Sequence, residues 1–193
     1  MLLRPRQKLF VERSLRALDE HGNALGVAPT GAGKTIMLSA VAGNMVGNSD
    51  AKACVLAHRD ELTEQNRGKF ARVNPGLSTS VIDARQKSWR GQVTFAMVPT
   101  LTRAANLDNL PVLDLLVIDE AHHAAADSYR RIIDRALDRN PDCRIFGLTA
   151  TPNRGDKKGL PDLDGPPIRA RDREQFESSG SWPRTLAGIS PNG

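Results

Sequence analysis

The chain has 193 residues, a length at which one α/β core is the default expectation. Its composition, 39% hydrophobic, 25% charged and 4% aromatic, is that of a soluble folded protein, and the formal charge of +5 favours a polyanionic partner without requiring one. No segment approaches the roughly 20 apolar residues of a membrane span, and charge and proline interrupt the N-terminus before a signal-peptide core could form, so we expect a cytoplasmic protein.

Helical and strand-like patterns alternate along the first 150 residues. Pro5 fits the first turn of a helix whose apolar residues recur at helical spacing until Gly22 ends the pattern. Three further segments without proline predict helices at residues 34–46, 60–70 and 128–139. Short apolar runs predict strands at residues 24–28, 53–57, 79–82, 93–97, 113–118 and 143–148.

The order of these elements predicts the fold class. Strands this apolar are expected to be buried on both faces, as in a mainly parallel sheet covered by crossover helices, which is a three-layer α/β fold. Ligands of such folds bind at the carboxyl ends of the strands. Cys54 and Cys143 lie in two of the apolar runs and are interpreted as core residues. Residues 1–155 are predicted to form one domain, and residues 156–193, rich in proline and glycine, an irregular tail.

Residues 28–35, with the sequence Ala-Pro-Thr-Gly-Ala-Gly-Lys-Thr, connect a predicted strand to a predicted helix. Glycines let the backbone approach phosphate oxygens, and the helix presents its free N–H groups to the anion. Lys34 would reach the β and γ phosphates, and the Thr35 hydroxyl would bind Mg²⁺. The general form of this loop has glycine where this chain has Ala28. The strand-then-helix context still favours a nucleotide site over an ordinary glycine turn followed by a surface lysine.

Two carboxylates, Asp119 and Glu120, follow the strand predicted at residues 113–118. Asp119 would hold Mg²⁺ directly or through water, and Glu120 would orient and deprotonate the water that attacks the γ-phosphate. An acidic pair at a strand end is more often a solvated turn or a helix cap. Downstream of a phosphate loop, on an expected neighbouring strand, the pair instead indicates function. His122 and His123 lack further ligands at zinc spacing, so zinc is not expected.

In this order, the motifs resemble those of superfamily-two helicases of the DEAD/DEAH type, and more closely the branch with XPB-like translocases and restriction-enzyme motor subunits. The resemblance covers roughly residues 3–154 and implies a RecA-like P-loop domain that binds ATP and Mg²⁺. Arg4 and Gln7 lie in a segment similar to the family's adenine-recognising element. Residues 119–122 match motif II. Motif I accepts alanine at position 28, and it implies ATP contacts from Pro29, Thr30, Gly31, Ala32, Gly33, Lys34 and Thr35.

Other motifs imply contacts with nucleic acid. Residues 56–62 resemble motif Ia and residues 97–103 a later strand-contacting motif, which implies that the phosphate backbone is bound by His58, Arg59, Thr100 and Arg103. Read without the family, the two arginines would be solvated surface charges. Residues 148–152 resemble motif III, and the resemblance implies that nucleotide and nucleic-acid sites are coupled by His122, Thr149 and Thr151. DNA is the expected partner, and RNA is an alternative.

Motors of this family use two such domains, because the second supplies an arginine finger to the ATP cleft. No second domain is recognisable after residue 155, so we expect either a truncated product or a domain that works with a partner chain. We therefore expect ATP and nucleic-acid binding with slow hydrolysis by this chain alone. Two other interpretations stay open: an ATP-binding interaction module whose arginines contact a protein, and a non-functional remnant.

Overall fold

The computed structural model describes residues 3–47, 50–57, 60–124 and 126–150. The tail predicted at residues 156–193 lies outside this range. The strands are β1 (Asn23–Val27), β2 (Ala53–Ala57), β3 (Thr79–Ile82), β4 (Val93–Met97), β5 (Leu115–Asp119) and β6 (Arg144–Thr149). The helices are α1 (Pro5–His21), α2 (Lys34–Val46), α3 (Asp60–Val73), α4 (Val98–Leu101), α5 (Ala104–Asp108) and α6 (Asp127–Arg139), with a 3-10 turn η1 (Ala121–His123).

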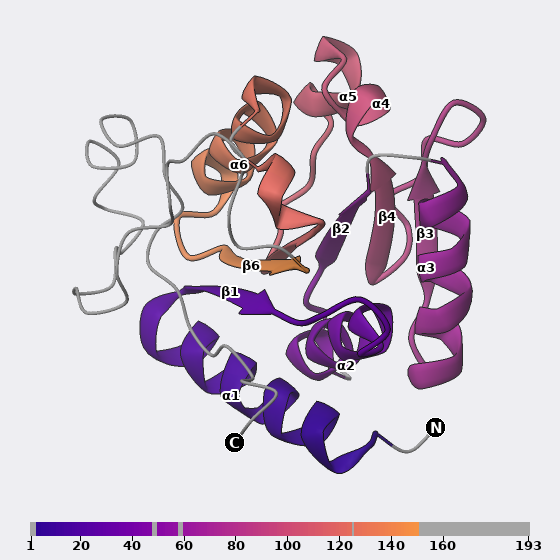
Figure 1. Ribbon diagram of the computed structural model, residues 1–193. Helices are drawn as coiled ribbons and strands as arrows, with labels where there is room; N and C mark the ends of the chain where they lie inside the picture. The colour runs from indigo at the N-terminus through magenta and orange to yellow at the C-terminus, as the bar shows by residue number, and fades with distance from the viewer. Residues whose placement is uncertain (1–2, 48–49, 58–59, 125, 151–193) are drawn as a thin grey trace.

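The strands form one sheet in the order β1-β6-β5-β2-β4-β3, and every pairing between them is parallel (Figure 1). The predicted α/β class and the mainly parallel sheet are therefore confirmed. One expectation was wrong: β1 and β5 are not neighbours, because β6 pairs with both of them. The carboxyl ends of all six strands still meet at one edge of the sheet, since their directions agree.

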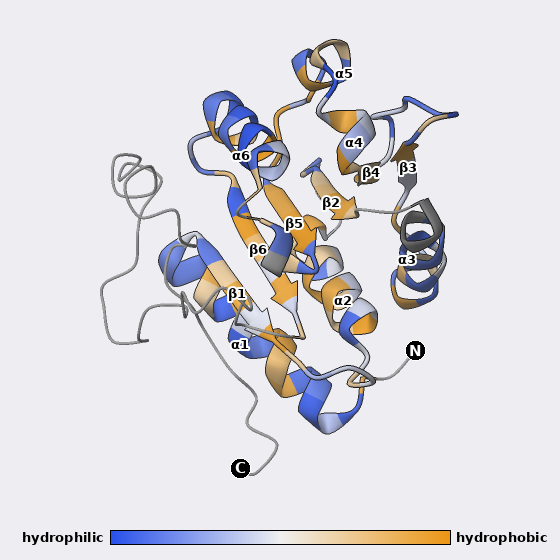
Figure 2. Ribbon diagram, turned by 45° about the horizontal axis from the view of Figure 1, so that its top comes forward, coloured by the Kyte–Doolittle hydropathy of each residue, from blue (hydrophilic) through white to orange (hydrophobic). Residues whose placement is uncertain are grey.

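Two hydrophobic clusters, one on each face of the sheet, account for the three layers. Buried residues of α1, α2 and α3 pack on one face, and those of α4 and α6 pack on the other. The alternation along β5 follows this division, because Leu115 and Val117 belong to the first cluster whereas Leu116 and Ile118 belong to the second. Figure 2 shows the apolar strands enclosed by helices whose outer faces are polar.

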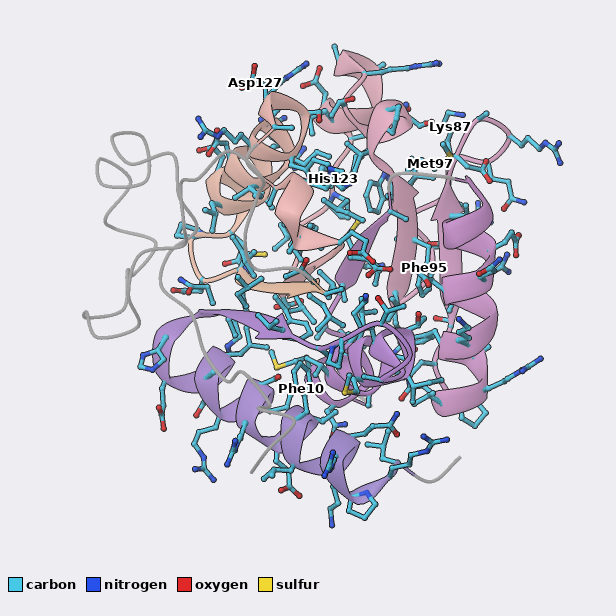
Figure 3. The ribbon with its side chains drawn as sticks, viewed as in Figure 1. Phe10, Lys87, Phe95, Met97, His123 and Asp127 are labelled. Atoms are coloured by element: carbon cyan, nitrogen blue, oxygen red, sulfur yellow. The ribbon has the colours of Figure 1, made fainter. Side chains whose placement is uncertain are left out.

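Aromatic side chains fix the helices of the first layer to the sheet. Phe10 is fully buried and packs so closely on β1 that a Cβ at Gly26 would overlap its ring (Figure 3). Phe70 of α3 meets Phe95 of β4 edge to face, with ring centroids 5.6 Å apart.

The two cysteines are buried and unpaired, as their interpretation as core residues predicts. Burial raises the pKa of the Cys143 thiol to about 12 and that of Cys54 still further, so both remain protonated at neutral pH.

The short helices α4 and α5 were not predicted, because four or five residues are too few to show helical periodicity. No helix in the described part of the chain is both long and apolar enough to cross a membrane.

Candidate nucleotide site

The phosphate loop connects β1 to α2 and depends on two glycines. Gly31 and Gly33 both have φ of 84°, the left-handed region in which other residues are strained. Gly33 caps α2, and its carbonyl accepts hydrogen bonds from the Ile36 and Met37 amides at 2.9 and 3.1 Å. The earlier amides of this turn have no intrahelical acceptor and are available to an anion in front of the helix.

The loop is fixed to the sheet at its first residue. Ala28 is 1% exposed, and its amide donates to the Thr149 carbonyl at 3.0 Å. A small side chain suits this buried position, which explains why alanine is compatible with the motif here. Thr149, predicted as a coupling residue, ends β6 and therefore touches the start of the loop through its backbone. Thr151, its predicted partner, lies outside the described residues.

Gln7 ties the first helix to the same loop. Its Oε1 accepts from the Arg4 amide at 3.0 Å, and its Nε2 donates to the Ala32 carbonyl at 3.0 Å. A Cβ at Gly33 would lie 2.5 Å from that Nε2 atom, so the glycine also makes room for Gln7. The carboxamide keeps one N–H and one lone pair for a further partner such as a base edge. Its bond to the phosphate loop was not foreseen from the sequence.

Asp119 ends β5, and both of its carboxylate oxygens accept a hydrogen bond. The amide of Glu120 donates to Oδ1 at 3.0 Å, and Nδ2 of Asn66 donates to Oδ2 at 2.9 Å. Asn66 belongs to α3 and is 2% exposed. Sequence reasoning missed it, although one signal was present: Asn66 lies four residues before Phe70, so the two residues share the buried face of the helix.

Opposing effects act on the pKa of Asp119. Burial is the largest and raises the pKa, and the nearby charge of Glu120 raises it further. The hydrogen bonds from Asn66 and from the Glu120 backbone, together with the charge of Lys34, lower it, and the net result is a raised pKa. The two donors therefore offset part of the cost of removing this carboxylate from water.

Glu120 has an unusual backbone conformation. Its φ is 54° and its ψ 55°, and among the described residues it is the one non-glycine with positive φ. The strand stops here and the chain turns into η1. The Glu120 carboxylate lies 3.4 Å from the Lys34 ammonium, with side-chain exposures of 34% and 15%. Lys34 thus meets the acidic pair in front of α2, although Lys34 and Asp119 are 85 positions apart in the chain.

A protein-family model described as "Type III restriction enzyme, res subunit" matches residues 1–154. The chain belongs to this family. It is an N-terminal motor domain of the superfamily-two helicase type, which confirms the family predicted from the motifs. The match includes the phosphate loop and the acidic pair in one continuous region.

Relatives and a solved structure agree with this assignment. The chain is 28% identical over 170 residues to a Saccharomyces cerevisiae protein named as ATP-dependent helicase IRC3, and 34% identical over 166 residues to a Schizosaccharomyces pombe protein named as mitochondrial ATP-dependent helicase irc3. Each alignment covers 82% of this chain but only 25% and 27% of the relatives, so the chain spans about a quarter of their length. The crystal structure of the Pyrococcus furiosus Hef helicase domain has the same fold, with a TM-score of 0.72, 22% identity, and coverage of 98% of this chain and 39% of that one.

The residues that were predicted to contact nucleic acid differ in accessibility. Arg103 is exposed just before α5, whereas Thr100 in α4 is only 4% exposed. The Thr100 carbonyl accepts from Asn106 Nδ2 at 2.7 Å, which holds α4 against α5. His58, Arg59 and the side chain of His122 lie outside the described part of the structure. The structure thus brings Lys34, Asp119 and Glu120 together, and of the two nucleic-acid candidates whose side chains it describes, Arg103 is the accessible one.

Proposed function

We propose that this domain binds Mg-ATP at the phosphate loop and hydrolyses it slowly by itself, as the ATP-binding part of a nucleic-acid-dependent motor that acts on DNA. The single observation that carries the proposal is the meeting of Lys34, Asp119 and Glu120 in front of the N-terminus of α2. The relatives' names, which describe ATP-dependent helicases, support the choice of nucleotide and a nucleic-acid partner. The charge of +5 agrees with a polyanionic partner.

The donor set fits magnesium delivered with a nucleotide. Within the described residues no group of three or more His, Cys, Asp or Glu side chains could hold a metal ion. Mg²⁺ needs no such group, because it is commonly held by one or two protein oxygens together with substrate phosphates and water. Thr35 and Asp119 would be those protein ligands. When bound, the metal would neutralise charge on the phosphate oxygens.

Lys34 and Glu120 have complementary parts in the proposed reaction. In the structure their opposite charges face each other at 3.4 Å. A polyphosphate is a stronger attractant for Lys34 than one carboxylate, so its arrival would draw the ammonium toward the loop and leave Glu120 to accept a proton from water. Glu120 has a left-handed backbone where the strand ends, and its carboxylate lies beside Lys34, the first residue of α2. Strain of this kind is typical of positioned functional groups.

Hydrolysis by residues 1–154 without a further motor domain is expected to be slow. In the family that the motifs resemble, a second motor domain supplies the arginine that stabilises transition-state charge, and such an arginine contributes about 10³ to 10⁵ in rate. Arg103, with His58 and Arg59, would contact DNA phosphates without reading sequence, so binding should weaken as salt increases.

Two substitutions test the proposal in the purified chain. Lys34→Ala should abolish binding of a fluorescent ATP analogue, because the phosphate charge loses its cation. Glu120→Gln should bind the analogue as the wild type does and lose the residual, DNA-stimulated phosphate release, because an amide cannot accept the proton. Equal phosphate release from wild type and Glu120→Gln would refute the role of Glu120. Tight binding by Lys34→Ala would refute the site itself.

A further inference from the structure

Asn66 makes a buried contact that none of the recognised motifs includes. It lies in α3, 53 residues before Asp119 in the chain, and is 2% exposed. Its Nδ2 donates to Asp119 Oδ2 at 2.9 Å, the distance of a good hydrogen bond to a charged acceptor. α3 packs mainly over β2 and β4 rather than over β5, so this bond reaches across from another part of the layer.

The Glu120 amide is the other donor to Asp119, and by itself it does not fix the orientation of the carboxylate. The Glu120 amide donates to Oδ1 from the adjoining residue, and that single bond allows the group to rotate about it. Asn66 holds the other oxygen from a different element, so the two bonds together fix the plane of the carboxylate. They also occupy one lone pair on each oxygen and leave the others for a ligand.

Packing alone does not explain an asparagine at this position. α3 is held to the sheet by Phe70, which is fully buried against Phe95 one turn further along. A leucine at position 66 would bury apolar surface without the cost of removing an amide from water. The polar side chain is therefore explained by its acceptor, the Asp119 carboxylate.

We propose that Asn66 is a positioning residue for the magnesium-dependent step: it orients the Asp119 carboxylate to receive the metal and makes that orientation depend on α3. This inference rests on the proposed binding of Mg-ATP at Asp119. α3 begins at Asp60, directly after the predicted nucleic-acid residues His58 and Arg59. A displacement of α3 on binding DNA would therefore change the metal site through Asn66.

The first experiment measures metal affinity rather than turnover. Mg²⁺ is titrated into the purified chain in the presence of a fluorescent ADP analogue, and binding of the analogue in EDTA is measured separately. Asn66→Leu removes the donor and keeps the number and branching of the side-chain heavy atoms, so apparent Mg²⁺ affinity should fall about 10- to 100-fold, the usual cost of losing a partner that orients a metal ligand. Binding without metal should not change.

Asn74→Leu is a matched control for the loss of a hydrogen bond. Asn74 Nδ2 donates to the Ser39 carbonyl at 2.9 Å in the same layer, but to no acidic residue of the site. Both leucine variants should melt at lower temperature than the wild type, and only Asn66→Leu should lose Mg²⁺ affinity. Equal loss in the two variants would show that general destabilisation, and not positioning, is responsible.

A double-substitution cycle tests the pair directly. In an Asp119→Asn background, adding Asn66→Leu should leave the remaining Mg²⁺ affinity unchanged, because its effect acts through the carboxylate. The exchanged pair, Asn66→Asp with Asp119→Asn, can rebuild the hydrogen bond with the charge on α3. It should therefore melt near the wild type yet bind Mg²⁺ as poorly as Asp119→Asn, and it remains informative if Asn66→Leu does not fold.

The outcomes separate this inference from the proposed function. Absence of Mg²⁺-dependent nucleotide binding in the wild type would overturn both. Normal wild-type binding with unchanged Mg²⁺ affinity in Asn66→Leu would overturn only the role of Asn66. Recovery of Mg²⁺ affinity by the exchanged pair would also overturn it, since the position of the charge would then not matter.

Discussion

The phosphate loop and the acidic end of β5 face each other, but they are built in different ways. The loop is one continuous segment whose shape depends on backbone conformation at Gly31 and Gly33. The acidic end depends on side chains brought together from separate elements: Asn66 on α3, Lys34 on α2 and Glu120 after β5. The first is therefore sensitive to changes in backbone freedom, and the second to the loss of single polar contacts.

Gly33→Ala should have the largest effect, because it changes the backbone-built region. An alanine at φ 84° costs roughly 1–2 kcal/mol, and its Cβ would also meet Gln7 Nε2 at 2.5 Å. We expect a lower melting temperature and loss of binding of a fluorescent ATP analogue. Adding Gln7→Ala should recover only the part due to the clash, which thermal melts of the double variant would measure.

Gly68→Ala is the matched control for this substitution. Gly68 lies in α3, has no positive φ, and a Cβ there would meet nothing within 4 Å. Alanine in a helix interior is favoured over glycine by roughly 0.5–1 kcal/mol. The control should therefore be more stable than the wild type. Similar destabilisation by both substitutions would mean that the phosphate loop is not specially dependent on glycine.

The same contrast explains what could be predicted from the sequence. The phosphate loop was recognisable because its residues are contiguous and each glycine has a local backbone reason. The strand segments were recognisable because both faces of the sheet are buried. The contact between Asn66 and Asp119 was not, since it joins residues 53 positions apart whose proximity depends on strand order. That order, with β6 between β1 and β5, leaves no local signal in the chain.

The backbone conformation at the acidic pair was also not predictable from the sequence. Glutamate has no preference for the left-handed region, so nothing in the sequence indicated that Glu120 would adopt φ of 54°. Its conformation follows from the abrupt end of β5 and the turn into η1. The sequence thus predicted which residues act at this end of the strand, but not how they are held.

The contribution of the acidic end of β5 to stability should depend on pH, whereas that of the phosphate loop should not. The pKa of Asp119 is raised in the folded state, chiefly by burial. A group whose pKa is raised by folding contributes stability that is fully present at pH values below its unfolded pKa, which is 3.8 for this carboxyl. That stability is lost as the pH rises through the folded pKa. Asp119→Asn does not titrate at this position. In EDTA, the melting temperature of Asp119→Asn minus that of the wild type should therefore increase from acidic to neutral pH.

Thermal melts over this pH range give the measurement, and Gly68→Ala supplies a control whose offset should not vary with pH. A difference that stays constant for Asp119→Asn would show that the carboxylate is as well solvated in the folded chain as in the unfolded one. A difference that decreases with pH would show that its donors outweigh burial. Either result would contradict the direction of the pKa shift.

Tyr129→Phe should have the smallest effect of the substitutions near the acidic end of β5. Tyr129 is 1% exposed, and its hydroxyl has no hydrogen-bond partner among the described residues. Burial, and then the nearby Asp119 charge, raise its pKa to about 12, so the hydroxyl remains protonated at neutral pH. Removing an unpartnered buried hydroxyl is neutral or stabilising, so Tyr129→Phe should change the free energy of unfolding by between nothing and a gain of about 1 kcal/mol. A clear loss in urea unfolding would instead indicate a buried water between the hydroxyl and Asp119, and the acidic end would then depend on contacts from both layers of the fold.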